Sequence, residues 1–138
     1  MSKLFIYTDG GARGNPGPAA IGVVIKNEKG EVISKISQTI GHNTNNYAEY
    51  SAVIAALDWL KDSNMKKDKD GISFYLDSTL VVNQLSGLFK VKENSLKILV
   101  LKVRELERAV GGNVSYAYIP REKNYEADLL VNQALDGC

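Results

Sequence analysis

Short apolar runs alternate along the chain with polar stretches that contain glycine, asparagine or aspartate. Such bounded runs are typical of β-strands, whereas apolar residues that recur every three or four positions are typical of helices. The pattern predicts strands at 4–9, 21–26, 32–40, 72–76 and 115–119, and helices at 48–61, 78–86, 95–110 and 124–135. An opening β-meander followed by βα units predicts an α/β fold in which a mixed sheet has helices on both faces.

The predicted helices differ in how much of their surface is apolar. The helix at 48–61 is apolar nearly all round, which predicts that it is deeply packed. The helix at 95–110 has one apolar stripe, is stopped by Gly111 and Gly112, and has Ser95 as its expected N-terminal cap. Residues 62–71 are charged and are most simply a solvated loop.

Composition and charge narrow the class of protein. The chain has 138 residues, of which 44% are hydrophobic and 24% charged, as expected for one globular domain spanning 1–138. A formal net charge of +1 means that a nucleic acid, if bound, would be held largely by local geometry. The sequence has no secretion-signal layout and no membrane-length apolar stretch, and its single cysteine, Cys138, forms no internal disulfide. We expect a monomeric, cytoplasmic protein with no membrane association.

Two of the predicted strands end in an aspartate. Their sequences are LFIYTD, which ends at Asp9, and ISFYLD, which ends at Asp77. If these strands are parallel neighbours, both carboxylates emerge at the carboxyl edge of the sheet, where ligands bind in open α/β folds. The spacing therefore proposes a paired acidic site.

Two further acids lie in the first turns of predicted helices. Glu49 lies on the buried stripe of its helix, and Asp128 lies one turn before Val131 at the margin of a core face. Local explanations also exist: Asn46-x-x-Glu49 fits a capping box, a helix dipole favours an acid near the position of Asp128, and aspartates often start turns. Each acid taken alone is explained more simply in this way.

Taken together, the four acids indicate a metal site. If they gather, each like-charge contact at ~4 Å costs on the order of 4 kcal/mol at an effective dielectric constant of about 20. Such a cluster persists only if protons or hard cations neutralise it, and carboxylate ligands suit Mg²⁺ or Mn²⁺ rather than zinc. The sequence offers no zinc-binding set of cysteines and histidines, because His42 is its only histidine.

Four blocks of the sequence resemble type 1 ribonuclease H. They read YTDGGARGNPGPAAIGVVI, TNNYAEYSAVIAAL, LDSTLVVNQLSG and PREKNYEADLLVNQALD, and they span nearly the whole chain in the family's order. The resemblance implies the RNase H-like fold, a five-stranded mixed sheet of order 3-2-1-4-5 whose first and fourth strands are parallel neighbours. It also implies an endoribonuclease that cleaves the RNA strand of RNA–DNA hybrids with two Mg²⁺ ions, for which Mn²⁺ can substitute. The expected products carry 5′-phosphate and 3′-hydroxyl ends.

The resemblance implies that the four acids are catalytic metal ligands. Asp9 is expected to bridge both ions, and Asp128 to help hold the ion that activates water. Glu49 and Asp77 are expected to hold the ion beside the leaving 3′ oxygen. Two ions ~3.5–4 Å apart stabilise the entering and departing oxygens of an in-line displacement.

The same resemblance implies a set of substrate-binding residues. Gly10 and Gly11 would let the backbone approach the RNA sugar. Asn15 and Asn45 resemble the family residues that read 2′-hydroxyl groups, the feature that distinguishes RNA from DNA. Thr44 resembles a residue that contacts a DNA phosphate.

The sequence departs from many family members in two places. The linker GLFKVKEN is too short for their basic helical protrusion, so Lys90, Lys92 and Lys97 form either a modest phosphate-binding patch or an ordinary solvated surface. The loop IPREKNYEA lacks the histidine thought to assist proton transfer or product release. Arg121 is the expected substitute, able to hold a phosphate but not to act as a base, because a guanidinium stays protonated.

Three other functions remain open from the sequence. A non-catalytic module that binds a hybrid or duplex would gain nothing from four mutually repelling acids. A related nuclease for duplex RNA or branched DNA would share the acids, although the glycines and asparagines favour RNA. A small-molecule α/β domain would have a deep apolar pocket at the sheet edge.

Overall fold

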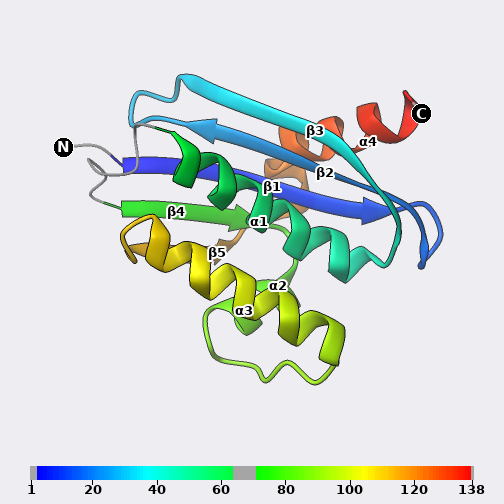
Figure 1. Ribbon diagram of the computed structural model, residues 1–138. Coiled ribbons are helices and arrows are strands. Elements are labelled where there is room, and N and C mark those ends of the chain that lie inside the picture. Colours follow the sequence, from blue (N-terminus) through cyan, green and yellow to red (C-terminus); the bar gives the residue numbers. More distant parts are fainter. Residues whose placement is uncertain (1–2, 64–70, 138) are drawn as a thin grey trace.

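A five-stranded mixed sheet organises the protein (Figure 1), whose computed structural model describes residues 3–63 and 71–137. The strand order is β3-β2-β1-β4-β5, as expected from the sequence; β1 and β3 are antiparallel to β2, whereas β4 is parallel to β1 and β5. The strands are β1 (Lys3–Ala12), β2 (Gly17–Lys26), β3 (Val32–Asn43), β4 (Gly71–Leu76) and β5 (Val114–Tyr118). Most of the charged connection expected at 62–71 lies outside the described residues.

Helices cover both faces of the sheet. They are α1 (Asn45–Asp62), α2 (Thr79–Leu85), α3 (Asn94–Ala109) and α4 (Tyr125–Asp136), and a short 3₁₀ helix, η2 (Arg121–Lys123), precedes α4. α1 packs on β1 and β2 with α3 beside it, and α4 crosses the opposite face over β2 and β3 (Figure 1). In the described part of the chain, no helix has the length and apolar character to cross a membrane.

Alternation along the strands decides which side chains meet which helix. Leu4 and Ile6 of β1 and Phe74 of β4 are completely buried in the core shared with α1. The alternate residues of the same two strands point to the other face of the sheet. On that second face, β2 carries Gly22, where a Cβ atom would collide with the Ala127 carbonyl of α4. The glycine therefore allows the backbone of α4 to lie directly on the sheet, which positions every residue of that helix.

Every element predicted from the apolar pattern is present, and the differences lie at the ends. β1 and β3 extend to Ala12 and Asn43, because pairing continues through glycine-rich and polar segments that carry no apolar signal. The expectation that Ser95 caps the third helix is wrong: α3 begins at Asn94, and its N-cap, Glu93, makes no side-chain capping hydrogen bond. Gly111 and Gly112 follow α3 with positive φ, as expected for residues that stop a helix.

Candidate active site

The two edges of β1 are paired over different lengths, and this creates an opening in the sheet. β1 pairs with β4 as far as Tyr7, which lies opposite Tyr75. Along its other edge, β1 pairs with β2 as far as Ala12, opposite Ala19. Beyond Tyr7, the backbone groups of β1 that point toward β4 therefore have no strand partner, and other groups must satisfy them.

Side chains supply the hydrogen-bond partners of these unpaired backbone groups of β1. The Gly10 N–H donates to Glu49 Oε1 at 2.9 Å and to Asp9 Oδ1 at 3.0 Å. The Thr8 carbonyl accepts a hydrogen bond from Asn124 Nδ2 at 2.9 Å. A carboxylate from α1 and an amide from the start of α4 therefore lie beside the end of the central strand.

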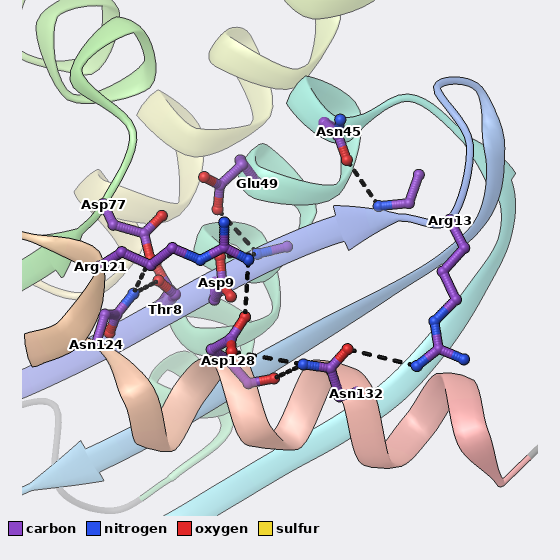
Figure 2. Close-up of polar contacts among 12 residues, drawn as sticks. Thr8, Asp9, Arg13, Asn45, Glu49, Asp77, Arg121, Asn124, Asp128 and Asn132 are labelled. Carbon is purple, nitrogen blue, oxygen red and sulfur yellow. Dashed lines mark hydrogen bonds and ion pairs between the residues drawn. The ribbon is translucent and has the colours of Figure 1, made fainter.

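Three carboxylates converge at this opening (Figure 2). One oxygen from each of Asp9, Glu49 and Asp77 lies within 4.8 Å of the others. Asp9 lies in β1, Asp77 directly follows the parallel neighbour β4, and Glu49 comes from α1. Asp128, in the first turn of α4, lies close enough for its charge to raise the pKa of Asp9. The structure thus brings together the four acids singled out from the sequence.

Burial makes this cluster costly to ionise. Asp9 and Glu49 are only 7% and 6% exposed. Burial raises the pKa of Asp9 to about 8, and the negative charges of Asp77 and Asp128 contribute to the rise. Burial also raises the pKa of Glu49 well above its ordinary value, with Asp9 and Asp77 adding to the effect. Without a cation, the cluster therefore holds a proton at neutral pH.

The capping-box explanation for Glu49 is wrong. The N-cap of α1 is Thr44, whose Oγ1 accepts from the Tyr47 N–H at 3.2 Å, and the helix begins at Asn45 rather than at Ala48. Glu49 instead accepts from Gly10 on the neighbouring strand. Its carboxylate is committed to the acidic cluster, so helix initiation does not explain its position.

The acids lie in an open cleft of about 590 Å³. Its lining combines the four acids with backbone from the end of β1, polar residues of α1 and the loop that precedes α4. Among the expected substrate-binding residues, Gly10, Gly11, Asn45 and Arg121 line it. This open, predominantly polar cleft suits a charged polymer better than a small apolar ligand.

Comparisons with known proteins place the chain in a family. A family model described as "Reverse transcriptase-like" matches residues 7–134. The structure of LC11-RNase H1, isolated from compost by a metagenomic approach, superposes with a TM-score of 0.93 at 48% identity over 99% of this chain and 98% of that chain. The chain belongs to the type 1 ribonuclease H family. LC11-RNase H1 has also been solved in complex with an RNA/DNA hybrid.

Curated relatives of this ribonuclease H chain are longer than it is. Ribonuclease HI of Halobacterium salinarum is 40% identical over 97% of the chain, which spans 65% of that protein. The bifunctional protein Rv2228c of Mycobacterium tuberculosis is 39% identical over 99% of the chain, which spans 36% of it. The RNase H1 structure from the same Halobacterium species superposes with a TM-score of 0.90, and the match covers 99% of both chains.

The two glycines after Asp9 have different structural environments in this ribonuclease H chain. A Cβ atom on Gly10 would lie 2.5 Å from Glu49 N and closer still to the Ala48 carbonyl, so this glycine is required where β1 touches α1. A Cβ atom on Gly11 would meet only ordinary contacts, at 3.8 Å or more. Packing against α1 requires a glycine at position 10, whereas no packing contact requires one at position 11.

Asn15 and Asn45 hold the loop beside the cleft through their oxygen atoms. Asn45 Oδ1 accepts from the Ala12 N–H at 2.8 Å, and Asn15 Oδ1 accepts from the Asn45 N–H at 3.0 Å. Within the described residues, no hydrogen bond engages the Nδ2 group of either side chain. Each amide is thus oriented by its oxygen, with its donor left for another partner.

Arg121 lies on η2, in the loop before α4, and lines the cleft together with the acids. Its side chain is 80% exposed, and its Nη2 atom lies 3.6 Å from Asp128 Oδ1 (Figure 2). His42 is not a substitute, because it lines a separate hollow with Leu135 and residues of β2 and β3. The exposed guanidinium is free to exchange this weak ion pair for a bound anion.

Sequence reasoning missed two asparagines on either side of Asp128. Asn124 lies four residues before it and contacts Asp77; Asn132 lies four residues after it and donates to the Asp128 carbonyl at 3.1 Å. Arg13 reaches Asn132 Oδ1 at 3.4 Å from the end of β1. The helical spacing of four was a usable signal for both asparagines, because residues four apart lie on one face of a helix.

Proposed function

We propose that the protein is an endoribonuclease that hydrolyses the RNA strand of RNA–DNA hybrids with the help of divalent cations. The observation that carries the proposal is the convergence of Asp9, Glu49 and Asp77 within 4.8 Å in an open cleft. Buried acids at this spacing oppose folding unless a cation or protons neutralise them. Membership of the type 1 ribonuclease H family and similarity to a relative solved with a hybrid support this substrate.

The donor set fits Mg²⁺, with Mn²⁺ as a substitute. Its ligands are carboxylate oxygens, whose negative charges a bound cation would neutralise. Neither a histidine nor a cysteine belongs to the group. Asp9, Glu49 and Asp77 would hold the ions, and Asp128 would complete the set from α4. Two bound ions would supply charge neutralisation and a water of lowered pKa for an in-line displacement that leaves 5′-phosphate and 3′-hydroxyl ends.

The residues around the acids account for recognition of RNA. Gly11 gives the sugar room to approach the end of β1. The free Nδ2 donors of Asn15 and Asn45 are suited to a 2′-hydroxyl, which accepts as well as donates. Arg121 is suited to a backbone phosphate, because its guanidinium is exposed and always charged. We retain Thr44 as a proposed DNA-phosphate contact next to Asn45.

A second hollow extends the binding surface toward the linker between α2 and α3. It measures about 460 Å³ and shares Asn46 and Leu80 with the acidic cleft. Lys90 and Lys92 line it together with the exposed Phe89. Lysines beside an exposed ring suit a nucleic-acid strand, so we propose that this hollow holds the second strand of the hybrid.

The test is cleavage of a labelled hybrid with and without Mg²⁺, beside the variants Asp9→Asn and Asp77→Asn. We expect either variant to lower kcat at least ~100-fold, because loss of metal-derived stabilisation costs several kcal/mol. Circular dichroism should show that both variants remain folded. Undiminished cleavage by either variant would refute the assignment.

Parallel reactions with duplex RNA and duplex DNA separate the rival functions. Preferential cleavage of the hybrid supports the proposal, and cleavage of another duplex with equal efficiency points to a different nuclease. Retarded migration of the hybrid in a gel without turnover in Mg²⁺ or Mn²⁺ would identify a binding module instead.

A further inference from the structure

Asn124 is buried beneath the acidic cluster and contacts three of the elements that carry it. Its side chain donates from Nδ2 to the Thr8 carbonyl at 2.9 Å and to Asp77 Oδ2 at 3.1 Å. Its backbone carbonyl accepts from the Asp128 N–H at 3.1 Å. A single residue, 1% exposed, therefore connects the end of β1, the acid after β4 and the first turn of α4.

We propose that Asn124 is a positioning residue that orients the Asp77 carboxylate for divalent-ion binding. The proposal rests on the proposed metal-dependent function of the cluster. A hydrogen bond to one carboxylate oxygen restricts rotation of the group, and partners of this kind behind metal ligands commonly affect both ion affinity and activity. The amide is neutral, so it orients Asp77 without placing a competing positive charge beside the cations.

The side chain of Asn124 is not used for the local role that its position would favour. Asn124 is the N-cap of α4, and asparagine at an N-cap ordinarily accepts a hydrogen bond from the first turn of its helix. Here the side chain makes no capping hydrogen bond and turns inward to Thr8 and Asp77. Helix initiation alone therefore does not explain this arrangement.

The polarity of the amide supports the same conclusion. Both atoms that face Nδ2 are acceptors, the Thr8 carbonyl and a carboxylate oxygen of Asp77, so the opposite orientation would set oxygen against oxygen. The consequence is that Asn124 Oδ1 is buried without a hydrogen-bond partner among the described residues. An unmatched buried acceptor destabilises the folded protein. The protein tolerates this cost at the residue that holds Asp77.

The variant Asn124→Ser separates positioning from helix initiation. Serine is also a good N-cap, so α4 should still form, but its hydroxyl is too short to contact both acceptors. Asn124→Ala removes the side-chain hydrogen bonds altogether. Tyr116→Phe is a matched control, because it removes a 2.6 Å hydrogen bond to Glu107 in a partly buried network that does not include the acids.

Three readouts test the proposal on the full chain: Mn²⁺ binding by titration calorimetry without substrate, kcat and KM on a labelled hybrid, and thermal unfolding. We expect both Asn124 variants to bind Mn²⁺ ~10-fold more weakly and to lose ~10–100-fold in kcat. KM for the hybrid should change little, because Asn124 lies beneath the cluster. Tyr116→Phe should lower thermal stability but keep Mn²⁺ affinity and kcat.

Each outcome identifies which idea fails. If the native protein neither binds Mn²⁺ nor cleaves the hybrid, the proposed function fails before the role of Asn124 is reached. If the native protein does both and the folded Asn124 variants match it, the positioning role is wrong. Failure of both variants to fold would assign the amide to stability alone and would equally overturn the proposal.

Discussion

Replacing Asp9 with asparagine should stabilise the ion-free protein at neutral pH while it removes activity. The carboxyl group of Asp9 has its pKa raised from 3.8 to about 8 in the folded protein, chiefly by burial. At pH 7 the folded protein keeps this proton, whereas the unfolded chain has released it. Folding must therefore take up a proton at a pH about 3 units above the ordinary pKa of the group.

The structure sets the size and the sign of this effect. Each pH unit in this interval contributes about 1.4 kcal/mol, so the penalty at pH 7 is on the order of 4 kcal/mol. A carboxyl whose pKa is raised on folding confers stability below its unfolded pKa, and this stability is lost as the pH rises toward the folded value. The ion-free protein should therefore become less stable between about pH 4 and pH 8. The asparagine introduced in place of Asp9 would carry no titrating proton and could still accept from the Gly10 N–H through its oxygen.

Urea unfolding at pH 5, 7 and 8.5, with EDTA and constant ionic strength, measures this prediction. Asp9→Asn should raise the free energy of unfolding at pH 7 by up to a few kcal/mol and flatten its dependence on pH. Asp58→Asn is the matched control, because it makes the same change of charge at a half-exposed residue of α1 whose ion pair with Lys61, at 3.4 Å, lies outside the cluster. Equal pH slopes for the native protein and Asp9→Asn, or a less stable variant at pH 7, would show that burial of the cluster has been misjudged.

Two other predictions follow from the geometry of the site. Binding of Mg²⁺ should displace the proton held by Asp9 and Glu49, so affinity should rise from pH 6 to pH 8, and calorimetry in buffers of different ionisation enthalpy should detect proton release; an affinity independent of pH would contradict the raised pKa values. Gly10→Ala should lower stability by about 1–3 kcal/mol in urea unfolding, because its methyl group would force β1 from α1, whereas Gly11→Ala should keep stability and raise KM for the hybrid. Equal stabilities for the two glycine variants would refute this distinction.

Local patterns in the sequence were sufficient to predict the elements and the sheet edge that carries the site. Asp9 and Asp77 each follow an apolar run, and the carboxyl ends of parallel strands meet at one edge. The position of Glu49 on a buried helical stripe likewise indicated its inward direction. These features depend on the periodicity of a single element, which a sequence displays directly.

Sequence reasoning did not predict the contacts that join β1 and α1, two elements that are separate in the sequence. The role of Asn46 and Glu49 as a capping box was locally plausible, but Gly10 on another element supplies the hydrogen bond that holds Glu49. The reason for Gly10 itself lies in the backbone of α1, which approaches too closely for a side chain. Neither contact has a signature within its own segment.

The sequence by itself determined the strands, the helices, their order and the family of this protein, because periodicity and motif spacing are properties of a continuous chain. Only the tertiary structure decided that β1 leaves β4 at Tyr7, and that Glu49 and Asn124 satisfy the backbone beyond it. Those contacts depend on where strand pairing stops, which is settled by packing between segments distant in sequence. Glu49 joins the two aspartates at the strand ends because the unpaired Gly10 N–H beyond Tyr7 donates to its carboxylate.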